Sequence, residues 1–449
     1  MSVAARSPVE RVAHIPMKFV STRSVAGEHV TFSTALERGL APDGGLYVPA
    51  SWPKLSLEDF DQVVSLADVA VNLLTPFLAG DPLEDDLAAI CREAFDFPAP
   101  QVEVGAGQAL SVLELFHGPT AAFKDFGARF LAASLTRLRT NVERPLNILV
   151  ATSGDTGGAV AAAFHRKDAV RVSVLYPRGL VSPTQEQQLT CWGDNVRTFR
   201  VAGTFDDCQR LVKEAFVDTE LRRQFDLSSA NSINVGRLLP QMVYYAAASL
   251  ASFRQNGVAP SLIIPAGNLG NAVACVWARH VGLPIGEIVL AHNANRTVPD
   301  YLDTGDWRPR ASLATLASAM DVGNPSNMER LHALFPELAS MQAALRAASV
   351  ADASIEARIK SDYQAYGQIW CPHTATAAEL YARLPAGERR DRQWILVATA
   401  HPAKFREIVE PLLGIAVPVP NTLARLFARA TQVEDLSGSL VALKAALVD

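Results

Sequence analysis

The chain has 449 residues, 49% of them hydrophobic and 19% charged, with a formal net charge of −5. This length allows two or three domains of roughly 100–200 residues, each with its own core. No basic stretch is long enough to neutralise a run of phosphates, so we expect no nucleic-acid partner. No apolar stretch approaches the roughly 20 residues of a membrane-spanning helix, and residues 242–253 come nearest. The five cysteines form no C-x-x-C pair, and we interpret them as buried thiols of a protein in the reducing cytoplasm.

The first hundred residues differ in composition from the rest. Residues 1–16 lack the apolar core of a signal peptide and precede a second methionine, Met17; we predict a disordered extension or a start site placed too early. Residues 17–108 combine polar loops around Asp43 with helices rich in Leu and Asp, which predicts a separate N-terminal domain. Its acidic run at residues 84–86 is interpreted as the solvated start of a helix, not as a pair of catalytic carboxylates.

Short apolar runs alternate with helical patterns through the rest of the chain. Runs rich in Val, Ile and Leu are typical of strands buried on both faces of a parallel sheet. The alternation predicts an α/β protein with mainly parallel sheets, divided into a first lobe at residues 109–255 and a second at 256–449. The predicted strands are Leu146–Ala151, 171–176, 196–201, Ser261–Pro265, 287–291 and Trp394–Ala398, and the predicted helices include 159–165, 272–280, 403–413 and an amphipathic stretch that begins at Cys208.

Two of the turns between a strand and a helix are rich in glycine, at residues 152–158 and 267–271. Such a turn presents free backbone N–H groups at the positive end of the helix dipole, where phosphates and carboxylates bind. A glycine-rich turn can also do no more than reverse the chain, but hydroxyls in the first and amides in the second favour anion binding. Neither G-x-x-x-x-G-K-[ST] nor G-x-G-x-x-G is present, so ATP and NAD are unsupported.

Lys124 lies on a predicted helix that has Thr120 as its candidate cap and is apolar nearly all round in its first turns. An all-round apolar helix is expected to be buried. A lysine on it either extends its ammonium to solvent or is functional, because a buried lysine has a lowered pKa and forms Schiff bases.

The segment around Lys124, residues 114–127, reads ELFHGPTAAFKDFG and closely resembles the cofactor-lysine motif of threonine synthases. Similar stretches follow in the family's order, and the resemblance extends from about residue 17 to about residue 413. It implies the tryptophan-synthase-β-like pyridoxal-phosphate fold, with two α/β lobes and an N-terminal α+β domain. The further matching stretches are residues 151–157, 175–179, 229–237, 267–271, 320–327, 372–375 and 399–405.

The resemblance implies an enzyme that converts O-phospho-L-homoserine and water to L-threonine and phosphate. Lys124 would hold pyridoxal 5′-phosphate as a Schiff base and remove the α- and β-protons. The hydroxyl of Thr399 would meet the pyridine nitrogen, which disfavours a protonated ring. We expect a monomer or homodimer and no metal. The remaining cofactor ligands implied are Asp155, Gly267, Asn268, Leu269, Gly270 and Asn271, and the candidate substrate ligands are Thr152, Ser153, Thr156, Arg178, Ser232, Asn234 and Arg237.

Three positions depart from the family pattern: Leu180 stands where many members have Lys, Leu269 where Phe is common, and Cys371 where an acidic residue is common. Leu180 and Leu269 leave open a related pyridoxal-phosphate lyase as an alternative. It could release 2-oxobutyrate from O-phosphohomoserine, act as a threonine dehydratase, or act on a phosphonate. A second alternative, of a different class, is a catalytically silent paralogue.

The three histidines in these motifs form no H-x₃-H or H-E-x-x-H pair. For His373 and His401 we favour packing or hydrogen bonding over proton transfer. The motif around His117 predicts that this side chain lies near the cofactor.

Overall fold

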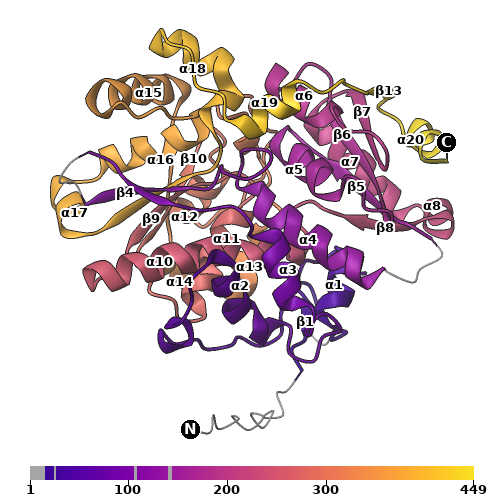
Figure 1. The fold of residues 1–449 in the computed structure, drawn as a ribbon, viewed down its shortest axis with the longest axis horizontal. Coiled ribbons are helices and arrows are strands. Elements are labelled where there is room, and N and C mark those ends of the chain that lie inside the picture. Colours follow the sequence, from indigo (N-terminus) through magenta and orange to yellow (C-terminus); the bar gives the residue numbers. More distant parts are fainter. Residues whose placement is uncertain (1–15, 25–26, 106–108, 140–143, 449) are drawn as a thin grey trace, which may run out of the picture.

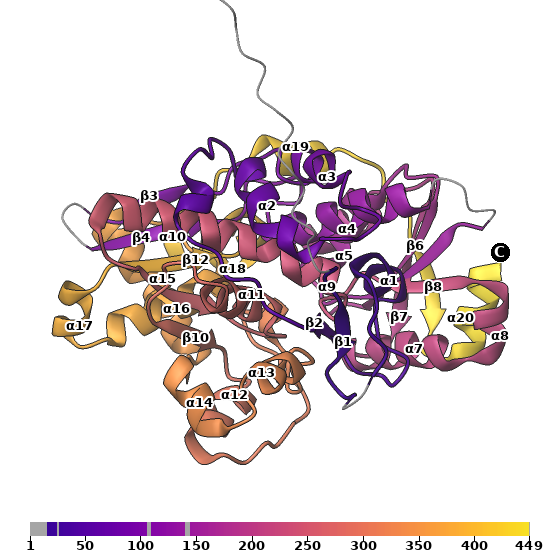
Figure 2. The same cartoon turned by 90° about the horizontal axis from the view of Figure 1, so that it is seen from below.

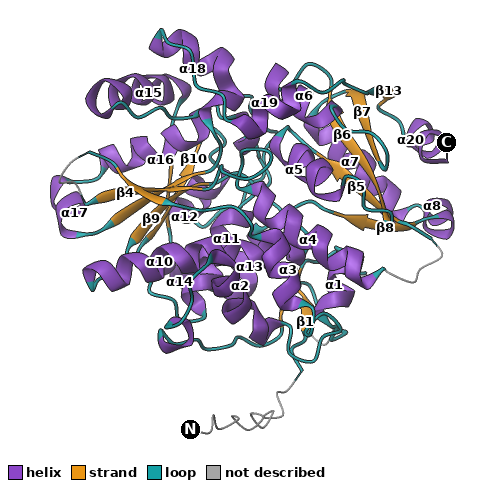
Figure 3. Ribbon diagram, viewed as in Figure 1, coloured by secondary structure: helices purple, strands orange, loops and turns teal. Residues whose placement is uncertain are grey.

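The computed structural model describes residues 16–24, 27–105, 109–139 and 144–448. Two large sheets lie on opposite sides of the molecule with helices packed between them (Figures 1 and 3). Residues 1–15 of the predicted N-terminal extension lie outside the described part of the chain.

The larger sheet has six strands in the order β11-β10-β9-β12-β4-β3. All neighbouring pairs are parallel except β3 and β4. Its three central strands β9, β10 and β12 are buried along their whole length, as runs of apolar residues predict. The bounds are β3 Gln101–Glu103, β4 Leu110–Glu114, β9 Ser261–Pro265, β10 Ile288–His292, β11 Arg346–Ser349 and β12 Trp394–Ala398.

The smaller sheet has five parallel strands in the order β13-β7-β6-β5-β8. Its edge strand β13 comes from the C-terminal end of the chain and pairs with β7. The bounds are β5 Leu146–Ala151, β6 Val170–Pro177, β7 Val196–Ala202, β8 Asp226–Ser229 and β13 Glu434–Ser437.

Helices connect the strands and cover the sheets. Those that accompany the smaller sheet are α4 Lys124–Leu138, α5 Asp155–Phe164, α6 Pro183–Thr190, α7 Phe205–Val217, α8 Thr219–Gln224, α9 Val235–Leu238, α19 Asn421–Phe427 and α20 Leu440–Val448. Those that accompany the larger sheet are α10 Met242–Asn256, α11 Gly270–His280, α12 Thr297–Thr304, α13 Met328–Leu334, α14 Leu338–Ala344, α15 Asp352–Tyr366, α16 Pro372–Arg383, α17 Ala386–Asp391 and α18 Arg406–Leu413. In the described part of the chain, none of these helices combines the length and apolar character needed to cross a membrane.

The N-terminal region is a small α+β unit that touches both lobes. Its helix α3 packs on α4 and its helix α2 packs on α10, as Figure 2 shows. The acidic residues 84–86 are exposed and directly precede α3, which confirms the predicted solvated helix start. The bounds are β1 Phe19–Ser21, β2 Tyr47–Pro49, α1 Phe32–Arg38, α2 Leu66–Leu74 and α3 Leu87–Ala94.

The predicted fold class is confirmed, and three predicted strands coincide with β5, β9 and β12. The sheets do not follow the predicted lobe boundaries, however. Strand β4, from the predicted first lobe, pairs with β12 of the second, and β13, from the predicted second lobe, pairs with β7 of the first. Each sheet is therefore completed by a strand from the other half of the chain, and the division at residues 109–255 and 256–449 stays a prediction.

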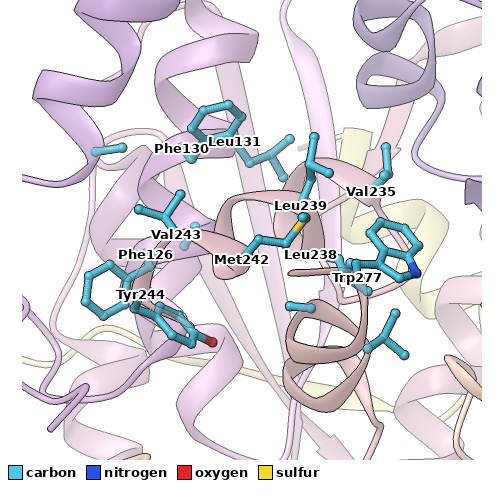
Figure 4. Close-up of a cluster of buried hydrophobic side chains, with 14 of the residues drawn as sticks. Phe126, Phe130, Leu131, Val235, Leu238, Leu239, Met242, Val243, Tyr244 and Trp277 are labelled. Atoms are coloured by element: carbon cyan, nitrogen blue, oxygen red, sulfur yellow. The ribbon is translucent and has the colours of Figure 1, made fainter. Parts of the chain in front are cut away.

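Buried side chains of α4 pack in one hydrophobic cluster with residues of α9, α10 and α11 (Figure 4). This burial confirms that the helix of Lys124 is enclosed, as its all-round apolar pattern predicts. Each large apolar side chain in such a cluster stabilises the fold by about 1.5–3 kcal/mol relative to an exposed one, so the position of Lys124 is rigidly set. The labelled members are Phe126, Phe130, Leu131, Val235, Leu238, Leu239, Met242, Val243, Tyr244 and Trp277.

Candidate active site

A pocket lies where strands β5, β9 and β12 end and helices α4, α5 and α11 begin. Its empty volume of about 940 Å³, open mouth included, lies within the range of cofactor and ligand sites. The carboxyl ends of parallel strands are where α/β folds bind ligands. Among the predicted site residues, those that line the pocket are Lys124, Thr152, Ser153, Asp155, Thr156, Ser232, Arg237, Gly267, Asn268, Leu269, Gly270, Asn271 and Thr399.

Lys124 is the first residue of α4 and is half-buried in the pocket wall. Its Nζ lies 5.2 Å from the centre of the Phe123 ring and, within the described residues, has no hydrogen-bonding partner. Burial lowers the pKa of Lys124 to about 8; the neighbouring carboxylate of Asp155 opposes this shift, and the cations of Lys404 and Arg237 add to it. The amine is therefore far more easily deprotonated than that of an exposed lysine.

The turn before Lys124 is held by Asp125 rather than capped by Thr120. The N–H and the hydroxyl of Thr120 donate to the Asp125 carboxylate at 2.8 and 2.6 Å. The cap position of α4 belongs to Phe123, whose side chain makes no capping bond. The prediction that Thr120 caps the helix was wrong, because α4 begins at Lys124, further along the chain than the sequence pattern suggested, and Thr120 acts as donor within the preceding turn.

The first glycine-rich turn, residues 152–158, uses part of its hydrogen-bonding capacity internally. The Thr152 hydroxyl accepts from the N–H groups of Gly154 at 3.0 Å and Gly157 at 2.9 Å. Gly154 has φ +133°, a conformation that side chains rarely adopt. The N–H groups of Ser153, Asp155 and Thr156 donate to no other described residue, so they remain open toward the pocket.

The Asp155 carboxylate is buried at this turn and is paired. Its Oδ1 lies 2.8 Å from Nζ of Lys404 and accepts from Nε2 of Gln185 at 3.1 Å. Burial by itself would raise the pKa of Asp155, but the ammonium groups of Lys404 and Lys124 outweigh it and hold the pKa well below its usual range. Asp155 is therefore an anion with a fixed orientation.

The second glycine-rich turn, residues 267–271, leaves its backbone donors open. None of its five N–H groups donates to another described residue. The backbone is shaped for this: Leu269 has φ +63°, and a Cβ on Gly267 would lie 2.8 Å from Cα of Met320. Tyr244 and Tyr245 both donate to Oδ1 of Asn271, while its Nδ2 is buried and has no partner among the described residues. Unpaired buried donors at a helix N-terminus are the features that a phosphate satisfies.

A polar network supports this second turn from behind. Asn268 and Asn327 both donate from Nδ2 to Oγ of Ser232, at 2.9 and 3.1 Å. The fully buried guanidinium of Arg330 donates to Oδ1 of Asn327 and to backbone carbonyls that include Tyr47 O. Sequence reasoning gave Asn327 and Arg330 no role; only the match at residues 320–327 pointed to this segment.

Thr399 follows β12 and stands beside the segment of Lys124. Its carbonyl accepts from the N–H of Phe123 at 2.9 Å, and Ala400 forms a bridge with Ala122. The Thr399 hydroxyl reaches the pocket and, within the described residues, has no hydrogen-bonding partner. It is therefore free for a ligand atom.

Arg237 is the buried cation of the pocket. One Nη1 hydrogen bond runs to Ala230 O, whereas Nε is buried without a partner. Burial lowers the pKa of Arg237 to about 10, opposed by the charge of Asp125. A guanidinium with no carboxylate bound to it is suited to an anionic ligand.

Two predicted substrate ligands lie outside the pocket lining. Arg178 is exposed, and its Nη2 pairs with Asp435 of β13 at 2.7 Å. Asn234 is fully buried as the cap of α9: its side chain donates to Leu36 O and Ser229 O and accepts from Gly236 N. The side-chain amide of Asn234 is therefore occupied by hydrogen bonds within the protein, which the sequence pattern does not reveal.

His373 and His401 both accept hydrogen bonds from backbone N–H groups, as the predicted hydrogen-bonding role requires. Nε2 of His373 accepts from Ala319 N at 3.0 Å, and burial lowers the pKa of His373 to about 4. Nδ1 of His401 accepts from Ala403 N at 3.1 Å. His117 pairs with Glu114 at 2.7 Å and is not among the residues that line the pocket, so its place near the cofactor stays a prediction.

The three departures from the family pattern occupy different environments. Leu269 is buried in the pocket lining, whereas Leu180 is 58% exposed and lies outside it. Cys371 is buried, and its Sγ accepts from Thr374 N at 3.4 Å at the start of α16. Cys371 thus takes over the capping role that an acidic side chain would also fill.

Comparison with known proteins agrees with this geometry. The family model "Pyridoxal-phosphate dependent enzyme" matches residues 97–400, flanked by "Threonine synthase N terminus" at 18–95 and "Threonine synthase, C-terminal" at 374–447. The threonine synthase of Haemophilus influenzae is 43% identical over 399 residues, covering 88% of this chain and 91% of that protein.

Solved structures match over nearly the whole chain. The crystal structure of threonine synthase from Escherichia coli has a TM-score of 0.88 and 37% identity, covering 96% of this chain and 99% of that one. The structure of threonine synthase with bound pyridoxal phosphate from Brucella melitensis has a TM-score of 0.87 and 34% identity, covering 96% and 98%. The predicted resemblance, enzyme class and cofactor are confirmed: the chain belongs to the threonine synthase family of pyridoxal-phosphate-dependent enzymes.

Proposed function

We propose that this enzyme converts O-phospho-L-homoserine and water to L-threonine and phosphate. One observation carries the proposal: a lysine with a lowered pKa shares its pocket with a helix N-terminus whose five N–H groups are open. That pair of features fits a cofactor with an aldehyde at one end and a phosphate at the other.

Different pocket residues would bind different parts of the cofactor. The N–H groups of residues 267–271, with Nδ2 of Asn271, would hold its phosphate. The hydroxyl of Thr399 would meet the ring nitrogen, and Lys124 would bind the aldehyde carbon. When bound, the cofactor supplies an electron sink for the substrate's α-carbon.

Lys124 is the base of the reaction in this proposal. Its Nζ takes a proton from Cα and then one from Cβ of the substrate, after which the Cγ–O bond breaks and phosphate leaves with the bonding electron pair. Cγ then gains a proton and the hydroxyl of water adds at Cβ. The two protons removed and the one that water releases end on Cγ, on Cα and on the departing phosphate. A pKa near 8 suits the task, because a general base works best when its pKa lies near the operating pH.

Arg237 and the first turn are the proposed substrate ligands. Arg237 lines the pocket, and no described carboxylate pairs with its guanidinium, which leaves the positive charge available to the substrate phosphate. The open N–H groups of Ser153 and Thr156 suit the substrate carboxylate, while the hydroxyl of Thr152 shapes the turn. Ser232 is proposed near the phosphate, and Arg178 contributes only if substrate releases it from Asp435.

One structural feature, the pocket residue Leu269, supports the alternative of a related pyridoxal-phosphate lyase. Its buried side chain presents an apolar surface to the pocket, which also suits a lyase that acts on a substrate with a less polar side chain.

The deciding experiment incubates the purified holoenzyme with O-phospho-L-homoserine and measures both phosphate and the amino-acid product. We expect threonine and phosphate in equal amounts, with activity lost in Lys124→Ala. Lys167→Ala is the matched control, because Lys167 pairs with Glu93 at the surface, 2.9 Å away, outside the pocket lining. Phosphate with 2-oxobutyrate would favour the alternative lyase, and a protein that captures no pyridoxal phosphate would point to a silent paralogue.

The location and the oligomeric state remain proposals. All five cysteines are buried and free, which supports the reducing cytoplasm. A monomer or homodimer stays a prediction, which sedimentation of the holoenzyme would test.

A further inference from the structure

Lys404 is a fully buried lysine directly behind the active-site pocket. It lies in the 3₁₀ turn Pro402–Phe405, and none of its surface is exposed. Its ammonium group makes two contacts, with Oδ1 of Asp155 at 2.8 Å and with the carbonyl of Thr120 at 2.9 Å. Burying a charged ammonium group costs free energy of folding unless the group is paired, so the partners of Lys404 indicate its role.

Each of these contacts reaches a segment that carries a pocket residue. Thr120 belongs to the turn that leads into Lys124, and Asp155 opens α5. Lys404 itself follows Thr399 by five positions in the chain. One ammonium group therefore joins the three segments that bring Lys124, Asp155 and Thr399 to the pocket.

Helix α6 completes the same arrangement from the other side. Nε2 of Gln185 donates to Oδ1 of Asp155 at 3.1 Å, and Nε2 of Gln188 donates to Thr120 O at 3.1 Å. Both acceptors of Lys404 are thus doubly bound, and neither can rotate toward another cation without losing two hydrogen bonds.

The charges around Lys124 give this arrangement a chemical consequence. The charges of Lys404, Lys124 and His373 lower the pKa of Asp155, and the guanidinium of Arg237 helps to lower the pKa of Lys124. Without Lys404, Asp155 would have Lys124 as its principal cationic partner, and an ion pair in a buried site strongly favours the protonated amine. A protonated Lys124 neither attacks an aldehyde nor accepts a proton.

We propose that Lys404 is a positioning residue: it neutralises Asp155 and fixes the segments of Lys124, Asp155 and Thr399, which keeps the Lys124 amine free for the cofactor and the substrate. The inference rests on the proposed function in that Lys124 is the amine that captures pyridoxal phosphate.

The test measures how fast the apoenzyme captures pyridoxal phosphate as a function of pH. In this step the neutral amine adds to the aldehyde carbon and water leaves. For the natural chain we expect the rate to rise with pH and to level off above a midpoint near 8, the pKa of Lys124. In Lys404→Gln, which keeps a donor but removes the charge, the midpoint should move up by at least about one unit, which slows capture at pH 7 about tenfold or more.

Two further variants separate this effect from simple damage. Lys444→Gln also removes a lysine from an aspartate, Asp218 at 2.7 Å, but at the surface, and should leave the midpoint unchanged. The double variant Lys404→Gln/Asp155→Asn removes both charges and should return the midpoint to the natural value or below.

The outcomes are distinguishable. A folded Lys404→Gln protein with the natural midpoint overturns the inference, even if its thermal stability is lower, because a purely structural role changes stability alone. If the single variant does not fold, the double variant decides: recovery of folding supports Asp155 as the group that Lys404 neutralises, and equal instability contradicts it. Failure of the natural chain to capture pyridoxal phosphate at Lys124 would instead refute the proposed function.

Discussion

The two glycine-rich turns of the pocket look alike in sequence and differ in what they leave open. In residues 152–158, the hydroxyl of Thr152 consumes two backbone N–H groups, and a buried carboxylate, Asp155, occupies the helix start. In residues 267–271, all five backbone N–H groups remain open and no carboxylate is present.

The difference shows that glycine content alone does not identify a phosphate site. The useful question is where the backbone donors of the turn go. A turn that holds an anion of its own is poorly suited to a phosphate dianion, whereas a turn of open donors on a helix of eleven residues is well suited to it. In our proposal the cofactor phosphate therefore binds at the second turn and the substrate at the first.

We expect the largest effect on cofactor binding from Gly267→Ala, in the second glycine-rich turn. Its new Cβ would lie 2.8 Å from Cα of Met320, a backbone atom that cannot move aside. The turn must therefore shift, and its N–H groups would no longer all point toward one phosphate. Loss of two hydrogen bonds to a charged group costs about 3–6 kcal/mol, so we expect affinity for pyridoxal phosphate to fall at least about 100-fold. Gly158→Ala, whose Cβ would meet Gln188 at an ordinary 3.5 Å, is the control. Equal cofactor titrations for both variants would contradict the assignment.

The second prediction concerns the substrate side and compares two arginines. Arg237→Met should raise the KM for O-phospho-L-homoserine about 10- to 100-fold, because a charge-assisted hydrogen bond is worth about 1.5–3 kcal/mol. Arg178→Met should change KM less than about twofold, since that guanidinium is occupied by Asp435 at the surface. Steady-state kinetics with saturating cofactor measure both. A larger effect at Arg178 would mean that the enzyme closes on its substrate and brings β13 and β6 into the site.

Much of the fold could be predicted because buried parallel strands leave a clear signature. The runs that became β5, β9 and β12 are apolar at nearly every position and end in small residues. Of the strands in the two large sheets, β3, β4, β8, β11 and β13 were missed. Strand β13 is mostly exposed and has only one buried side chain, so no periodicity marks it, and pairing between distant segments is a tertiary property.

Site residues could be predicted where they belong to a contiguous sequence motif. They could not be predicted where their role depends on contacts with distant parts of the chain. Lys124 and residues 267–271 belong to contiguous motifs. The burial of Asn234 could not be predicted, because its hydrogen-bonding partners come from α1 and β8. Lys404 was overlooked although it stands between two buried apolar residues, Ala403 and Phe405. Its pairing with Asp155, about 250 positions away in the sequence, only becomes visible in three dimensions.

The smallest expected effect tests whether the first turn is a packed structural element. Gly157 and Gly158 are neighbours in α5, yet a Cβ on Gly157 would lie 2.5 Å from Thr152 Cγ2 and 2.6 Å from Leu189 Cδ2. Gly157→Ala should therefore lower the free energy of unfolding by about 1–3 kcal/mol. Gly158→Ala should raise it by about 0.4–1 kcal/mol, since alanine restricts the unfolded chain and its Cβ finds space. Urea unfolding of the two apoenzymes measures the difference. If both variants were equally stable, the Thr152 side chain would be free to move, and the hydroxyl now bound within the turn would become available to the substrate.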